Sequence, residues 1–239
     1  PYQHAGYKWL RFLNEFKFGG CLADDMGLGK TVQTLALLAH EMEENPGLTS
    51  LLVMPTSLIY NWELEARKFT PELKILVYSG TQRIKDPWRF GEYDLVLTSY
   101  GITRLDVEVL KGFYFNYIIL DESQAIKNPG SNIAAAVNQL KSKQKLILTG
   151  TPVENSTMDL WSQMNFINPG LLGNQNTFKK QFLLPIEKQG DLGKSAKLHA
   201  MIKPFILRRL KSQVATDLPE KITNVQYSAM TAAQEEVYE

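Results

Sequence analysis

The sequence predicts an α/β fold: a mostly parallel sheet with helices on both faces, followed by a helical protrusion near the C-terminus. Three observations support this prediction. Short apolar runs alternate with longer helical patterns through the first two thirds of the chain, as in βαβ units. Several of these runs are apolar almost throughout, which is typical of strands covered on both faces. After about Pro169 the rhythm changes to a mainly helical and basic pattern.

The individual elements follow from this alternation. The predicted strands are Gly20–Ala23, Ser50–Met54, Lys74–Tyr78, Leu95–Thr98, Tyr117–Leu120 and Lys145–Leu148. The predicted helices between them are Thr31–Glu44, Leu58–Phe69, Thr103–Lys111 and Ile133–Leu140. Strand–helix alternation of this kind predicts right-handed βαβ units and a parallel sheet.

Three segments make up the predicted organisation. Residues 1–170 form the α/β core, residues 171–221 form the helical protrusion, and residues 222–239 return to the core. The chain begins at Pro1 and stops at Glu239 inside an expected helix. We therefore expect it to be part of a larger protein.

Composition narrows the functional class. The 239 residues are 44% hydrophobic and 21% charged, which is ordinary for a globular protein. No apolar run approaches the roughly 18 residues of a membrane span, so we expect no membrane partner. A single cysteine excludes an internal disulfide, and the scattered histidines argue against structural zinc.

Charge is unevenly distributed although the net charge is only +1. Basic side chains clearly outnumber acidic ones between Lys179 and Lys221, and the remainder is mildly acidic. This basic segment predicts either a contact with a polyanion or a solvated helical surface, and the count alone does not separate the two.

The strongest local motif is a candidate phosphate-binding loop. Residues 23–31 read Ala-Asp-Asp-Met-Gly-Leu-Gly-Lys-Thr, after a predicted strand and at the start of a predicted helix. Inward-facing N–H groups and the helix N-terminus favour phosphate, Lys30 can reach the β- and γ-phosphates, and the Thr31 hydroxyl can bind Mg²⁺.

The loop departs from the strict pattern at one position. Asp24 replaces the first glycine, but aspartate tolerates tight turns. The alternative is a chance Gly-Lys-Thr. The predicted nucleotide-binding residues here are Asp25, Met26, Gly27, Leu28, Gly29, Lys30 and Thr31.

A second motif places two carboxylates at the end of an apolar strand. Asp121 and Glu122 directly follow Tyr117–Leu120. Ligands bind beyond the carboxyl ends of strands in open α/β sheets, so these side chains are expected near Lys30. Asp121 would hold Mg²⁺ and Glu122 would polarise the attacking water. Lys30, Asp121 and Glu122 are the candidate catalytic residues.

A third motif is the hydroxyl-rich turn at residues 148–152, Leu-Thr-Gly-Thr-Pro. Thr149, Gly150 and Thr151 could sense the γ-phosphate and couple it to a nucleic-acid site. By itself the segment favours a plain turn, because Gly-Thr-Pro is good turn chemistry.

With these motifs in view, the chain resembles the Swi/Snf family of superfamily-two helicase-like DNA-translocating ATPases, specifically their N-terminal RecA-like lobe. Residues 1–3 with Trp9 look like the adenine-recognising segment, with Gln3 as the base contact. Five further stretches look like motifs I, Ia, Ib, II and III in family order: residues 23–31, 53–62, 94–100, 121–128 and 148–166. Residues 203–219 resemble the segment that closes the family's helical protrusion, which RNA helicases of the DEAD-box type lack.

The resemblance implies ATP and Mg²⁺ as cofactors and double-stranded DNA, held through its phosphates, as partner. It also implies a second RecA-like lobe in the same parent protein, reached beyond residues 222–239. That lobe supplies arginines to the transition state, so this chain alone is expected to hydrolyse ATP very slowly. The implied DNA contacts are Ser57, Thr98, Ser99, Arg208 and Arg209.

Several roles stay open at this level. Arg208, Arg209 and Lys211 could contact the DNA backbone or brace the protrusion. Trp9, Trp62 and Trp161 fit core anchors better than stacking platforms, and Tyr100 fits either role. In motif II, Ser123 and Gln124 replace the commoner Ala-His. Hydrolysis depends on Asp121 and Glu122, so the replacement affects the coupling contact that the histidine usually makes, which here falls to Gln124.

The competing functions are a nucleotide-regulated DNA- or protein-binding module and an RNA helicase lobe. The expected location is cytoplasmic, with the nucleoid, if the source is prokaryotic, and nuclear if it is eukaryotic.

Overall fold

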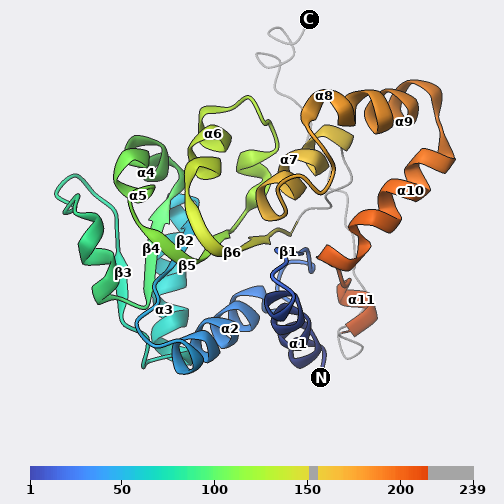
Figure 1. Cartoon of the computed structure of the whole chain (residues 1–239). Coiled ribbons are helices and arrows are strands. Elements are labelled where there is room, and N and C mark those ends of the chain that lie inside the picture. Colours follow the sequence, from blue (N-terminus) through green and yellow to red (C-terminus); the bar gives the residue numbers. More distant parts are fainter. Residues whose placement is uncertain (151–155, 215–239) are drawn as a thin grey trace, which may run out of the picture.

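A single parallel sheet organises the chain. The computed structural model describes residues 1–150 and 156–214, which form a seven-stranded sheet in the order β3-β4-β2-β5-β6-β1-β7 (Figure 1). Every strand pair in it is parallel, so the predicted fold class is confirmed. The strands are β1 (Gly20–Leu22), β2 (Ser50–Met54), β3 (Ile75–Val77), β4 (Leu95–Ser99), β5 (Tyr114–Leu120), β6 (Lys141–Leu148) and β7 (Ile206–Leu207).

Helices cover both faces of this sheet. The α-helices are α1 (Tyr2–Glu15), α2 (Lys30–Glu44), α3 (Ile59–Phe69), α4 (Tyr100–Leu105), α5 (Val107–Leu110), α6 (Asn132–Gln139), α7 (Thr157–Ile167), α8 (Gln175–Phe178), α9 (Leu184–Gln189), α10 (Leu192–Ile202) and α11 (Lys211–Val214). Figure 1 shows α1, α2 and α3 below the sheet and α4 to α7 above it. No helix in the described part of the chain is long and apolar enough to span a membrane.

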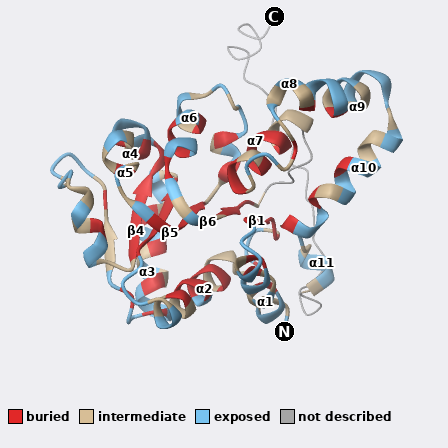
Figure 2. Ribbon diagram, in the orientation of Figure 1, coloured by how far each residue is buried: buried red, intermediate tan, exposed pale blue. Residues whose placement is uncertain are grey.

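The pleat of the strands divides the core into two apolar layers. Successive residues of a strand point to opposite faces, so Leu52 packs with α2 and α3, whereas its neighbours Leu51 and Val53 pack with α4, α6 and α7. Figure 2 shows the buried residues concentrated in the strands and in the helix faces turned toward them. This double cover explains why β2 and β4 are buried along their whole length.

Parallel pairing brings the carboxyl ends of the central strands to one edge. Leu22 at the end of β1 is in register with Leu148 of β6, and Ile147 of β6 is in register with Leu120 of β5. The segments that follow these three strands therefore emerge side by side. They are the three motifs that the sequence singles out.

The predicted helical protrusion is present. The segment from α8 through a π-helical turn (Lys179–Leu183), α9 and α10 leaves the sheet and forms the orange arm in Figure 1. Asn174 and Asp191 start α8 and α10 by accepting hydrogen bonds from backbone N–H groups of the first turn.

The arm returns to the sheet earlier than predicted. The chain rejoins the core at Ile206, where β7 pairs with β1 as the edge strand. We expected residues 171–221 to remain in the protrusion and residues 222–239 to return. A two-residue strand carries no periodicity that a sequence could display, so this edge is not visible from the sequence. Residues 222–239 lie outside the described residues.

Several predicted elements have different bounds in the structure, and the largest differences concern the 103–111 helix and β6. The predicted helix over 103–111 is divided into α4 and α5, because Asp106 leaves the helical backbone between them. β6 begins at Lys141 rather than Lys145, because its polar start pairs with the first residues of β5. Cross-strand pairing thus overrides the local polarity there.

Candidate nucleotide site

The loop between β1 and α2 has the backbone that the glycine-rich motif predicts. Gly27 and Gly29 have φ angles of 83° and 75°, in the left-handed region that favours glycine. A Cβ atom on Gly29 would lie 2.3 Å from the Gln3 side-chain nitrogen, so glycine also permits close approach of α1. Gln3, the predicted base contact, donates a long hydrogen bond of 3.5 Å to the Leu28 carbonyl. The structure therefore brings the first helix against the candidate phosphate loop.

Lys30 begins α2 and folds back onto this loop. Its Nζ atom donates to the backbone carbonyls of Asp24 at 2.6 Å and Asp25 at 3.3 Å. Burial lowers the pKa of Lys30, and the negative charges of Asp121, Asp24 and Glu122 oppose that shift. The ammonium group thus lies within the field of the carboxylates that follow β5. Thr31 occupies the next position in the first turn of α2.

Asp121 is held by a tryptophan from a neighbouring helix. The indole Nε1 of Trp62, in α3, donates to Asp121 Oδ2 at 2.8 Å, and the Glu122 amide donates to Oδ1 at 2.9 Å. Burial raises the pKa of Asp121, and these two hydrogen bonds oppose the shift. The Tyr100 hydroxyl donates to the Asp121 carbonyl at 2.7 Å. Two aromatic side chains from other elements therefore fix this residue.

Glu122 adopts a backbone conformation that is uncommon for residues other than glycine. Its φ and ψ angles are 50° and 55°, in the left-handed region. Such conformations persist where the surrounding structure enforces them, and they cluster at functional sites. The Gln124 amide donates to Glu122 Oε2 at 2.8 Å. Gln124, the predicted coupling residue, thus contacts the predicted water-polarising carboxylate directly.

The third motif reaches the same loop from β6. The Thr149 amide donates to the Leu22 carbonyl at 3.2 Å, which extends the pairing between β6 and β1. A Cβ atom on Gly150 would lie 2.8 Å from Met26 Cγ and 3.7 Å from Lys30 Nζ. Gly150 therefore lies against the candidate phosphate loop. Thr151 lies outside the described residues.

Two of the residues predicted to contact DNA have little access to solvent. Thr98 is fully buried and its hydroxyl donates to the Tyr78 carbonyl at 2.8 Å. Ser99 is 3% exposed, and its Oγ accepts from the Ile102 amide at the start of α4. Ser57 is exposed in the turn after β2. Thr98 and Ser99 belong to β4, which helices cover on both faces, whereas Ser57 lies beyond the end of β2. This explains why only Ser57 is exposed.

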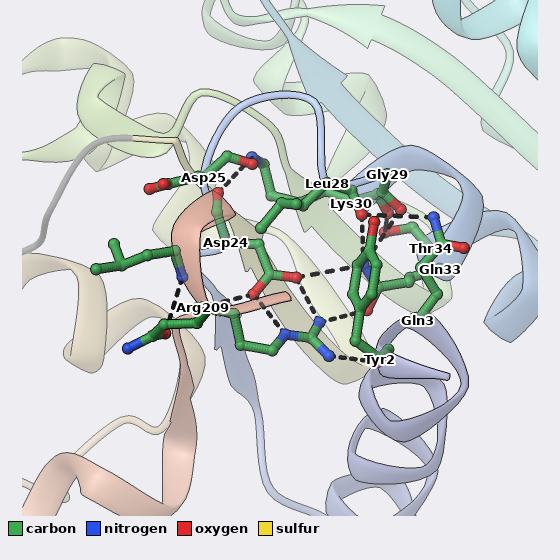
Figure 3. A network of polar contacts seen from close by, with 12 residues as sticks. Tyr2, Gln3, Asp24, Asp25, Leu28, Gly29, Lys30, Gln33, Thr34 and Arg209 are labelled. Carbon is green, nitrogen blue, oxygen red and sulfur yellow. Dashed lines mark hydrogen bonds and ion pairs between the residues drawn. The ribbon is translucent and has the colours of Figure 1, made fainter. Parts of the chain in front are cut away.

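Arg208 and Arg209 point to different surroundings. Arg208 is exposed and lines a cavity between α7 and α10. The guanidinium of Arg209 instead contacts the carboxylate of Asp24 inside the protein (Figure 3). Of the two roles left open for Arg209, its contacts are those of an internal brace.

Of the aromatic residues whose roles the sequence left open, Trp62, Trp161 and Tyr100 are buried, and Trp9 packs against the core. Trp62 is 1% exposed, Trp161 donates to the Gly173 carbonyl, and half-buried Trp9 donates to the Pro204 carbonyl. Sequence reasoning missed the hydrogen bonds of Trp62 and Tyr100 to Asp121. The sequence offers only a general signal for the Trp62 bond: a buried indole N–H group needs a hydrogen-bond acceptor, but the sequence does not say which one.

Comparisons with known proteins agree with this geometry. The family model described as SNF2-related domain matches residues 2–239. YwqA of Bacillus subtilis is 42% identical over the whole chain, which spans 27% of that protein. TATA-binding protein-associated factor MOT1 of Saccharomyces cerevisiae is 38% identical over 99% of the chain, which spans 14% of it.

Solved structures match over the whole chain. The SWI2/SNF2 ATPase core of Sulfolobus solfataricus in complex with double-stranded DNA superposes with a TM-score of 0.84 at 45% identity. A second structure, of the Sulfolobus solfataricus SWI2/SNF2 ATPase core domain, gives a TM-score of 0.82 at 46% identity. The chain spans 50% and 49% of these two structures, so it corresponds to about half of such a core. With its RecA-like sheet and a family match along nearly its entire length, this chain belongs to the SNF2-related domain family.

Proposed function

We propose that this chain is the ATP-binding first lobe of a motor that couples ATP hydrolysis to translocation on double-stranded DNA. The observation that supports this most directly is the meeting of three strand ends. Lys30, the Asp121–Glu122 pair and Gly150 arrive from β1, β5 and β6 at one edge of the sheet. Such a convergence of a cation, a carboxylate pair and a turn suits a nucleoside triphosphate.

In this proposal the chain's own residues bind and orient the nucleotide. Gln3 contacts the base, residues 25–29 surround the phosphates with backbone N–H groups, and Lys30 exchanges its carbonyl contacts for phosphate oxygens. Glu122 polarises the attacking water, and its orientation is fixed by its left-handed backbone and by Gln124. Thr149, Gly150 and Thr151 transmit the state of the γ-phosphate.

The available donors suit Mg²⁺. No cluster of three or more His, Cys, Asp or Glu side chains that could hold a metal occurs in the described ranges. Mg²⁺ bound with a nucleotide needs few protein ligands, because phosphates and water fill most of its octahedron. Asp121 and the Thr31 hydroxyl supply the hard oxygen ligands. The ion would neutralise charge that develops on the phosphates.

The DNA contact is proposed from a similar structure, the Sulfolobus core in complex with double-stranded DNA. In this lobe we propose Ser57 and Arg208 as phosphate contacts, since both are exposed. Hydroxyl and guanidinium contacts to phosphates set position without reading sequence, so binding should weaken steeply with salt.

The decisive experiment compares the chain alone with the chain joined to its second lobe. ATP hydrolysis is measured with duplex DNA, single-stranded DNA and RNA in parallel. The two-lobed protein should be stimulated by duplex DNA, and the chain alone should be about 10³–10⁵-fold slower because it lacks the arginines of the other lobe. Comparable turnover by the chain alone would refute the motor proposal.

Two other outcomes of this experiment correspond to the competing functions. Stimulation by RNA but not by duplex DNA would favour an RNA helicase lobe. ATP-dependent DNA binding without hydrolysis would favour a nucleotide-regulated binding module. In a prokaryotic cell the motor would work in the cytoplasm on the nucleoid, and in a eukaryotic cell it would work in the nucleus.

Trp62→Phe is expected to weaken the use of Mg²⁺. Phenylalanine keeps most of the apolar packing but removes the N–H group that orients Asp121. Loss of such an outer contact typically costs about 10–100-fold in metal affinity or activity. The Mg²⁺ concentration for half-maximal ATP hydrolysis should therefore rise, with a smaller change in the rate at saturating Mg²⁺. Trp161→Phe, which loses an indole bond elsewhere, is the matched control.

A further inference from the structure

The first position of the phosphate loop holds a buried charge. Where the strict motif has glycine, this chain has Asp24, whose side chain is fully buried at the end of β1. Its backbone carbonyl also accepts a hydrogen bond from the Lys30 ammonium group. An isolated carboxylate in such a place is strongly unfavourable, so a partner is required.

Arg209 is that partner, and it satisfies both carboxylate oxygens. Its backbone amide and its Nε atom donate to Asp24 Oδ1 at 3.1 and 2.9 Å, and a terminal nitrogen donates to Oδ2. This fork geometry is available to arginine and not to lysine. The Arg209 side chain is only 13% exposed.

The same guanidinium connects two other walls of the site. It donates to Gln33 Oε1, in α2, at 2.8 Å and to the Tyr2 carbonyl in α1, and it lies over the Tyr2 ring at 5.3 Å. Figure 3 shows Arg209 between these residues with its charged end turned toward Asp24. Gln33 in turn donates to the Gly29 carbonyl at 3.2 Å, inside the phosphate loop.

The backbone around Arg209 continues the β1–β7 pairing into the loop. The Ala23 amide donates to the Leu207 carbonyl at 2.7 Å, and the Asp25 amide donates to the Arg209 carbonyl at 3.0 Å. Beyond them the Lys211 amide donates to Asp25 Oδ2 at 3.0 Å. The segment that returns from the helical arm is thus bonded to consecutive residues of the phosphate loop.

We propose that Arg209 is a positioning residue for ATP, which through Asp24 holds the phosphate loop in its binding conformation and makes the returning segment of the arm a third wall of the nucleotide site. This inference rests on the proposed ATP-binding function. It goes beyond that function in linking the loop to a residue 185 positions away in the sequence. The arm and the nucleotide then stabilise each other, because each favours the same arrangement of residues 206–211.

The test measures binding of a fluorescent ATP analogue, with Mg²⁺, to this chain and to four variants. Arg209→Gln and Asp24→Asn each leave one member of the pair unmatched, and we expect binding about 10–100-fold weaker. The variant carrying both changes leaves no buried charge unpaired, so it should lose less than the product of the two single losses. Lys188→Gln, which removes an exposed charge from the same arm, should bind like the unaltered chain.

Melting temperatures separate positioning from simple support of the fold. If the single variants melt lower but the folded protein binds the analogue with unchanged affinity, the pair is only structural and the inference fails. Should Arg209→Gln not fold, Arg209→Lys keeps the charge without the fork, and unchanged binding by it would equally overturn the inference. Lost DNA affinity with unchanged nucleotide affinity would assign Arg209 to the DNA surface instead. Failure of the unaltered chain to bind the analogue would refute the proposed function itself.

Discussion

Lys30→Ala is expected to lower ATP hydrolysis by the two-lobed protein about 10²–10³-fold, the usual cost of removing one donor that stabilises developing negative charge. The ammonium group lies at the start of α2, within the field of four carboxylates, and donates to two backbone carbonyls of the loop. Alanine keeps the helix but removes the only cationic side chain of residues 23–31. Without it, no side chain of the loop stabilises the negative charge that develops on the γ-phosphate.

The measurement is the steady-state rate with saturating duplex DNA, together with ATP affinity. Lys197→Ala removes an exposed lysine from the helical arm and is the control. In the proposed site Lys30 contacts the phosphates in both the ground state and the transition state. The affinity for ATP and the rate of hydrolysis should therefore both fall. A variant that hydrolyses ATP at the unaltered rate would remove Lys30 from the proposed site.

Glu122→Gln is expected to separate binding from chemistry. Glutamine has the same shape and can keep a hydrogen bond to Gln124, but it cannot accept a proton from water. Removal of a general base typically costs about 10²–10⁴-fold in rate. ATP affinity should change little, since Asp121 and the phosphate loop remain intact. Hydrolysis and nucleotide binding are therefore measured side by side.

The control for this change is Glu72→Gln, which removes an exposed carboxylate outside the motifs. Equal loss of binding and rate in Glu122→Gln would indicate that Glu122 supports the fold of its strained turn. Retention of the full rate would place the water-polarising group on another residue.

The fold was predictable because the signals that define it are local. Each central strand contains a short apolar run, and the phosphate loop follows β1 within a few residues. Parallel pairing then dictates that Lys30 and Asp121 share one edge of the sheet, which a sequence can imply without coordinates. The sequence also resembles the Swi/Snf family, and the family match confirms that resemblance.

The parts that escaped prediction depend on partners distant in sequence. Nothing near Asp24 indicates that Arg209 neutralises it, and nothing near Asp121 indicates that Trp62 orients it. Thr98 follows the apolar run of its strand, but the depth of β4 in the sheet decides that its hydroxyl faces a backbone carbonyl. Only tertiary packing supplies this information.

The position of β1 has a consequence for the order in which the molecule can form during synthesis. β1 is the first of the seven described strands to be synthesised, yet its neighbours β6 and β7 lie more than 100 residues later in the chain. Contacts of such high sequence separation form slowly, because long loops must close first. The strand β1 and the phosphate loop that follows it therefore stay without the second neighbour, β7, until the arm has been translated. A nascent chain that stops before Ile206 would carry every residue of the phosphate motif and still lack the edge against which that motif is set.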